Sequence, residues 1–171
     1  PEGKAHRATI LFSGTAQGAA REAQAELAER WDVGAELWSA TSYKRLREQA
    51  LSTERWNRLH PNEPARTPLV TELLGTEGGP VVAVTDFMKA VPDQVSRWVR
   101  QPFVPLGTDG FGRSDTRERL REFFEVDMPH IVVATLSGLA RQGDVKAETV
   151  ADAIAHYGID TERTDPRAFD L

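Results

Sequence analysis

The chain has 171 residues, of which 40% are hydrophobic and 27% charged, and its formal net charge is −5. This is the composition of a globular chain of about one domain, and an acidic chain with no long basic run is not typical of a nucleic-acid-binding protein. The absence of cysteine excludes disulfides, thiolate metal sites and cysteine nucleophiles. No apolar run approaches the roughly 20 residues of a membrane span, so we expect a cytoplasmic protein without a membrane partner.

The first half of the chain alternates between strand and helix patterns. Short apolar runs predict strands, and apolar residues at helical spacing predict helices. In chain order we expect a strand over Ala8–Ser13, a helix over Ala16–Trp31, a strand over Val33–Ser39, a helix from Tyr43 to about His60, a proline-rich loop over 61–68 and a short helix over Leu69–Leu74.

The second half continues the alternation. The continuous apolar run Val81–Thr85 predicts an inner strand that is covered on both faces. We then expect a helix over Pro92–Val99, a strand over Phe103–Leu106 and three further helices, over Arg117–Phe124, from Asp127 to Arg141 and over Ala147–Tyr157. Alternating strands and helices predict one α/β domain over residues 1–171, with a mostly parallel sheet between helices. Since the chain starts at Pro1 without a methionine, we expect it to be a fragment of a longer protein.

Capping residues mark three of these helix ends. Asp115, with Glu118 three residues later, predicts a capping box at the start of the helix that begins near Arg117. Asp127 is expected to cap the next helix, and Gly158 is expected to end the last one.

A glycine-rich loop is the strongest candidate for function. The residues Gly107 to Asp115 (GTDGFGRSD) lie between a predicted strand and a predicted helix, where ligands bind in open α/β sheets. Backbone N–H groups at a helix start attract anions, and Arg113 would add positive charge. The spacing is neither the dinucleotide fingerprint nor a P-loop, so a tight turn with glycines at positive φ is the alternative. The candidate residues in this loop are Asp109, Gly110, Phe111, Gly112, Arg113 and Asp115.

The evidence for a function is weaker for the other candidate residues. Asp109 and Asp115 could form a carboxylate pair for acid–base catalysis, but the capping role of Asp115 is the more common use of such a residue. None of the four histidines has metal-ligand spacing, and His60 is expected to be a loop or interface residue. The four tryptophans are many for this length, and either packing or a subunit contact explains them. We therefore assign no catalytic, cofactor-binding or metal-binding residue.

Several stretches resemble one known family. In chain order they are Val33–Tyr43 (VGAELWSATSY), Glu54–Pro61 (ERWNRLHP), Val84–Lys89 (VTDFMK), Leu106–Arg117 (LGTDGFGRSDTR), Phe123–Asp127 (FFEVD) and Val150–Ile159 (VADAIAHYGI). Together they resemble the C-terminal domain of the homodimeric pyruvate dehydrogenase E1 component, a bacterial thiamine-diphosphate enzyme related to transketolase. The stretch from Leu106 to Arg117 is specific to this branch, whereas transketolases carry a looser version.

The resemblance implies a three-layer α/β/α domain with a mostly parallel five-stranded sheet. It places the antiparallel first strand just before Pro1, so we expect the sequence to lack that strand. It also implies that thiamine diphosphate and magnesium bind to other domains of the enzyme, and that this domain binds neither alone. Thr108-Asp109-Gly110 is similar to the Gly-Asp-Gly thiamine motif, but Thr108 replaces its first glycine and no Asn-Asn pair follows.

The resemblance further implies a role within a larger enzyme. The whole protein would decarboxylate pyruvate and transfer the acetyl group to the lipoyl group of its E2 partner, dihydrolipoyl acetyltransferase. This domain would supply homodimer contacts and one wall near the cofactor entrance, and the 171-residue chain alone would be inactive. Two alternatives remain open: a stand-alone docking or regulatory module with the same fold, and the C-terminal domain of another thiamine-diphosphate enzyme.

Overall fold

The computed structural model describes residues 3–76 and 78–168, which form four strands and the helices between them. The strands are β1 (His6–Phe12), β2 (Val33–Ser39), β3 (Val81–Val84) and β4 (Phe103–Leu106). The helices are α1 (Gln17–Arg30), α2 (Tyr43–Leu59), α3 (Leu69–Leu74), α4 (Ala90–Asp93), α5 (Arg117–Phe123), α6 (Met128–Gln142) and α7 (Ala147–Tyr157), with short 3₁₀ turns η1 (Gly14–Ala16) and η2 (Ser96–Trp98).

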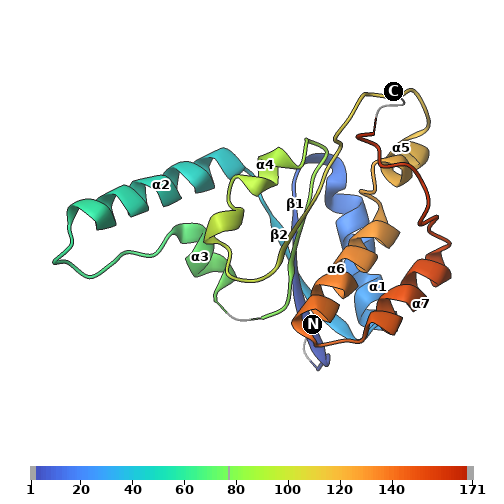
Figure 1. Cartoon of the computed structure of the whole chain (residues 1–171), viewed down its shortest axis with the longest axis horizontal. Helices are drawn as coiled ribbons and strands as arrows, with labels where there is room; N and C mark the ends of the chain where they lie inside the picture. Colours follow the sequence, from blue (N-terminus) through green and yellow to red (C-terminus); the bar gives the residue numbers. More distant parts are fainter. Residues whose placement is uncertain (1–2, 77, 169–171) are drawn as a thin grey trace.

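The four strands form one sheet in the order β2-β1-β3-β4, and every neighbouring pair is parallel. Figure 1 shows α1, α6 and α7 on one face of this sheet and α2 and α3 on the other. The three-layer α/β/α class expected from the sequence is therefore confirmed. The antiparallel strand of the expected five is not among the described residues.

Each face of the sheet has its own core. On the α1 and α6 side, Ile10, Leu27 and Leu136 are fully buried in one cluster. On the α2 and α3 side, the second cluster contains Leu11 and Val95. All four residues of β3 are buried, which confirms the prediction of an inner strand covered on both faces.

One prediction about a helix end was wrong. The N-cap of α5 is Thr116, whose Oγ1 accepts the N–H of Arg119, while Asp115 accepts the N–H of Thr116 itself. Asp115 and Glu118 therefore do not form a capping box. At the other predicted ends, Asp127 caps α6, and Gly158 ends α7 in the left-handed conformation.

The helix expected over Pro92–Val99 is two short turns, α4 and η2. The Ser96 hydroxyl donates to the carbonyl of Asp93, 2.9 Å away, which is the acceptor that a continuing helix would use at residue 97. The backbone then closes with bonds three residues apart, from Trp98 to Val95 and from Val99 to Ser96. Between Asp93 and Val99 the backbone therefore continues as 3₁₀ turns and not as one α-helix.

The stretch Arg117–Gln142 has the length and mean hydropathy of a helix that could cross a membrane. In the structure it is two helices, because Glu125 adopts φ 58° between α5 and α6. Four apolar side chains of α6, those of Ile131, Val132, Leu136 and Leu139, are fully buried in the core. Core packing therefore accounts for the hydropathy of this stretch.

Candidate functional site

A pocket of about 300 Å³ opens at the carboxyl ends of the strands. The sheet order places β1 beside β3, so the chain leaves these neighbours in opposite directions, and ligands bind in open α/β sheets at such a switch point. The loops after β1, β3 and β4 all contribute to the wall of this pocket. Its residues are Thr15, Ala16, Thr85, Asp86, Thr108, Gly110, Gly112, Arg113, Leu120, Arg121, Phe124 and Val126.

Asp86 places a carboxylate beside the start of α1. Its Oδ2 accepts the N–H of Thr15 at 3.2 Å, and a Cβ on Gly14 would lie 2.1 Å from its Oδ1. Gly14 also has φ +60°, so its backbone conformation favours glycine as well. The protein's own carboxylate thus takes the position near a helix start where an external anion would otherwise bind.

A hydroxyl pair beneath the pocket joins the loops after β1 and β3. Ser13 Oγ donates to Thr85 Oγ1 at 2.7 Å, and the same Thr85 oxygen accepts the N–H of Phe87 at 3.1 Å. Both Ser13 and Thr85 are buried. The loop after β4 joins this network through Thr108, which bonds the carbonyl of Asp86 through its hydroxyl and that of Phe87 through its N–H.

The glycines of the loop differ in what they require. Gly110 has φ +101°, as the tight-turn interpretation expects, but Gly107 and Gly112 are not in the left-handed region. At Gly107 the constraint is space, because a Cβ there would lie 2.5 Å from the carbonyl oxygen of Phe87. A Cβ on Gly112 would meet no atom within 4 Å.

The charged loop residues mostly bond within the chain. Asp109 Oδ1 accepts the N–H of Lys89 at 2.8 Å, and Asp115 accepts the N–H of Thr116, so each carboxylate has a backbone partner. Arg113 lies over the ring of Phe123, with its guanidinium carbon 4.2 Å from the ring centroid. Neither the geometry of Asp109 nor that of Asp115 favours the acid–base pair, while Arg113 still lines the pocket.

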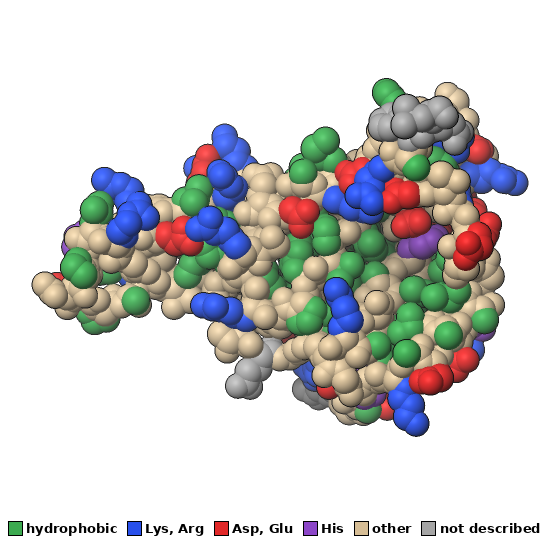
Figure 2. Space-filling model, in the orientation of Figure 1, with side chains coloured by type: hydrophobic (Ala, Val, Ile, Leu, Met, Phe, Trp, Pro, Cys, Tyr) green, Lys and Arg blue, Asp and Glu red, His purple; other side chains and the backbone are tan. Residues whose placement is uncertain are grey.

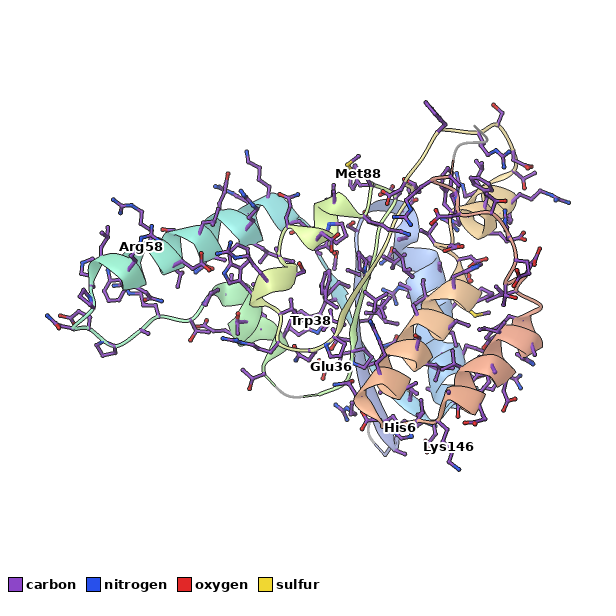
Figure 3. The ribbon with its side chains drawn as sticks, viewed as in Figure 1. His6, Glu36, Trp38, Arg58, Met88 and Lys146 are labelled. Atoms are coloured by element: carbon purple, nitrogen blue, oxygen red, sulfur yellow. The ribbon has the colours of Figure 1, made fainter. Side chains whose placement is uncertain are left out.

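The loops after β3 and β4 carry exposed apolar side chains at this edge of the sheet. Phe87, Met88 and Phe111 have exposed fractions of 56%, 57% and 73%. Figure 3 shows Met88 near the carboxyl ends of the strands, above α4. Exposed apolar groups gathered in one region are typical of a surface that another domain or subunit covers.

The structure does not bring His60 to this pocket. His60 follows α2 at the end remote from the sheet (Figure 1), where its ring stacks on Trp56 with centroids 4.4 Å apart. Arg66 lies over the same indole, 3.6 Å from its centroid. The loop or interface role expected for His60 stays a prediction, and it concerns a different surface from the glycine loop.

Glu54 holds the middle of α2 to η2. Its carboxylate accepts hydrogen bonds from Arg97 Nη2 at 2.6 Å and from Trp98 Nε1 at 2.8 Å. The bond from Arg97, followed by the bond from Trp98, holds the pKa of the Glu54 carboxyl below its usual value. A lowered folded-state pKa stabilises the protein above the pKa of the unfolded chain, and this stabilisation is lost as the pH falls through the folded-state pKa.

Replacing Glu54 with glutamine is therefore expected to destabilise the protein at pH 7. The difference in free energy of unfolding from wild type should become smaller as the pH is lowered toward 3. The cost at pH 7 should be at most about 1 kcal/mol, because the ion pair is open to solvent. Urea unfolding at several pH values measures it, with Glu63→Gln as the control, since Glu63 has no ion pair within the described residues. A difference between the Glu54 variant and wild type that grows on acidification would contradict the assignment.

A larger groove of about 790 Å³ lies on the other side of the sheet, between the end of β2 and the helices α2 and α3. It is lined mainly by apolar side chains, among them Leu11, Trp38 and Leu73. Trp38 is 40% exposed and lies on the edge strand of the sheet (Figure 3). Of the other tryptophans, Trp98 is buried and Trp31 donates to the hydroxyl of Tyr157.

Among the described residues there is no group of three or more His, Asp or Glu side chains that could hold a metal ion. The residues that sequence reasoning missed are Thr85, Asp86 and Arg121. Asp86 directly follows a predicted strand, so the rule that directed attention to the glycine loop also applies to it.

The family described as the transketolase-like TK C-terminal domain matches residues 1–127. A pyruvate dehydrogenase E1 component of Pseudomonas aeruginosa is 47% identical over 163 residues, which cover 95% of this chain and 18% of the relative. The protein of the same name from Mycolicibacterium smegmatis is 48% identical over 160 residues, 94% of this chain and 17% of the relative. The pyruvate dehydrogenase E1 component of Escherichia coli K12 is 42% identical over 167 residues, which cover 97% of this chain and 19% of the relative. The chain thus spans about a fifth of the length of these relatives.

Proposed function

We propose a function from the premise that this chain belongs to the family of transketolase-like C-terminal domains, whose match covers residues 1–127. The chain is the C-terminal domain of a pyruvate dehydrogenase E1 component. The single observation that carries this proposal is its identity of 42–48% over at least 94% of the chain to relatives of that name. The expected resemblance to this family is confirmed by the same comparisons.

The whole enzyme would be a cytoplasmic bacterial homodimer that decarboxylates pyruvate with thiamine diphosphate and magnesium, and then acetylates the lipoyl group of E2. Its cofactor would be held by domains outside this chain, which spans about a fifth of the length of its relatives. A calorimetric titration showing tight binding of thiamine diphosphate to these 171 residues alone would contradict this division of roles.

Within that enzyme, this domain would supply one wall of a space between domains. Two observations support such a role. The pocket at the carboxyl ends of the strands is lined by apolar side chains, among them Leu120 and Phe124, and by the charged residues Asp86, Arg113 and Arg121. Phe87 and Met88, on the loop after β3, are exposed, as expected for a surface that faces another part of a larger protein.

Replacing Arg113 with alanine in the full-length enzyme is expected to lower kcat/KM about tenfold, because a displaced wall of a substrate path costs catalysis more than stability. Loss of its contact with Phe123 should cost about 0.5–1 kcal/mol of stability. Steady-state kinetics with pyruvate, together with thermal unfolding, measure both effects.

Arg163→Ala is the matched control for that experiment. Arg163 lies over the same Phe123 ring, 5.1 Å from its centroid, but does not line the pocket at the strand ends. The control should therefore lose similar stability and retain its kinetics. Equal activity losses in both variants, or wild-type kinetics for Arg113→Ala, would contradict a role of the glycine loop in catalysis and leave it a structural turn.

A further inference from the structure

Helix α2 and the segment that returns from it form an arm, residues 43–68, that extends from the rest of the domain. Figure 1 shows the far half of α2 and its return loop projecting beyond the sheet and its covering helices. Leu59, near the end of the arm, is 53% exposed. An element that protrudes in this way has a large surface available for another molecule.

The arm is internally braced. Asn57 forms two hydrogen bonds to the backbone of Arg66, each 2.8 Å long, and so ties the end of α2 to the returning chain. The ring of His60 stacks on Trp56, and the guanidinium of Arg66 also lies over this indole. These contacts hold the loop in one shape, so little entropy remains to be lost when the arm binds a partner.

The arm is basic, although the chain is acidic. Residues 43–68 contain six arginine and lysine side chains and three glutamates, whereas the whole chain has a net charge of −5. Among the described residues, neither Arg55 nor Arg58 has an ion-pair partner within 4.0 Å. Figure 3 shows Arg58 pointing outward from the arm. The end of the arm thus presents positive charges beside the exposed side chain of Leu59.

An acidic groove lies on the opposite side of the sheet. It measures about 590 Å³ and runs between α1 and α5, with four carboxylates and two arginines in its wall. Its residues are Ala19, Glu22, Glu118, Arg119, Arg121, Glu122, Asp127 and Met128. Arg121 is engaged with the carbonyl of Thr15, while within the described residues Glu22 and Glu118 have no ion-pair partner. Met128 and Ala19 give the groove an apolar portion.

The arm cannot reach the groove of its own chain. In Figure 1, α2 lies on one face of the sheet and points away from it, while α1 and α5 lie on the other face. In Figure 2, Lys and Arg side chains follow the arm, and Asp and Glu side chains gather at the opposite end of the molecule. In a dimer with two-fold symmetry, the arm of one copy can contact the groove of the other copy. The symmetry then makes the same contact between the second arm and the first groove.

We propose that the arm, residues 43–68, docks into the acidic groove between α1 and α5 of a second copy of this chain. The proposal rests on the homodimer proposed above and assigns the contact between the two subunits to these two surfaces. Arg55 and Arg58 pair with Glu22 and Glu118 of the other subunit, and Leu59 packs beside Met128. Complementary charge orients the two surfaces, and the apolar contact adds affinity.

The test uses the purified full-length protein with the photoreactive residue p-benzoylphenylalanine in place of Leu59. Irradiation should give a covalent dimer whose adducts lie on peptides that contain Glu22, Glu118 or Met128. The same residue in place of Arg141, which is exposed at the end of α6, should give no covalent dimer. Monomeric product from the Leu59 variant, or adducts confined to other peptides, would overturn the arm–groove contact.

Charge reversal provides a second measurement. Arg55→Glu/Arg58→Glu and Glu22→Arg/Glu118→Arg should each lower the covalent-dimer yield at least about tenfold, since each places like charges together. Combining the two pairs should restore the yield, which only direct pairing predicts. The control Arg141→Glu/Lys146→Glu changes the net charge by the same amount as the arm variant and should leave the covalent-dimer yield unchanged. Failure of the combined variant to recover would reject the pairing, whereas monomeric wild-type protein in sedimentation would reject the dimer-contact role as well.

Discussion

Replacing Gly107 with alanine is expected to lower the free energy of unfolding by about 3 kcal/mol, because the added methyl group has no space. Its Cβ would lie 2.5 Å from the carbonyl oxygen of Phe87 and 2.9 Å from the amide nitrogen of Lys89. Both atoms belong to the backbone, so neither can turn aside as a side chain would. The loops after β3 and β4 would have to separate, and the bond from Thr108 N–H to the Phe87 carbonyl would weaken.

Gly112→Ala is the matched control, five residues later in the same loop. A Cβ at Gly112 meets nothing within 4 Å and its φ is not in the left-handed region, so this variant should be as stable as wild type or slightly more stable. Urea unfolding of both variants measures the difference. Equal stabilities of the Gly107 and Gly112 variants would show that the loops adapt, and that the close approach at Gly107 is not a structural requirement.

Replacing Thr85 with valine is expected to cost about 2 kcal/mol, since valine keeps the shape of threonine and loses its oxygen. That oxygen accepts from both Ser13 Oγ and the N–H of Phe87 in a fully buried position. Without it, two donors beneath the pocket lose their acceptor. The free energy of unfolding, measured in urea, should fall, and hydrogen exchange at the amide of Phe87 should accelerate.

Thr135→Val serves as the control for this change. Thr135 is also fully buried, but its hydroxyl donates to the carbonyl of Ile131 one turn earlier in α6. That carbonyl is already an acceptor within the regular helix, so the variant should lose less than about 1 kcal/mol. If the two valine variants were equally destabilised, the cost would come from burying a threonine-sized side chain and not from the link between loops.

Helix and strand prediction succeeded where the sequence pattern is local. The bounds of β2, β4, α3 and α7 agree with the residues expected, because local spacing of apolar residues and stops such as Gly158 mark them. It failed at Asp115, where two neighbouring side chains both suit the N-cap position and only the backbone geometry of Thr116 decides between them. It also failed after Asp93, where the chain closes in 3₁₀ turns that the apolar spacing did not indicate.

The candidate site was predicted in part. Sequence reasoning found Gly110 and Arg113, which line the pocket, because a glycine-rich loop after a strand is a recognisable local signal. It missed Asp86, whose role depends on Gly14, more than seventy residues earlier in the chain. It also named His60 as a candidate, although the end of α2 and the glycine loop lie on different parts of the domain.

By itself, the sequence determined the α/β class, the order of the elements and the family, since periodicity and short motifs are properties of neighbouring residues. Only the tertiary structure decided which segments meet. It placed Asp86 beside the start of α1, left the arm extended, and put its positive charges and the acidic groove on opposite sides of the sheet. The physical reason is that strand order is set by packing across the whole sheet, so contacts between distant residues have no local signature in the chain.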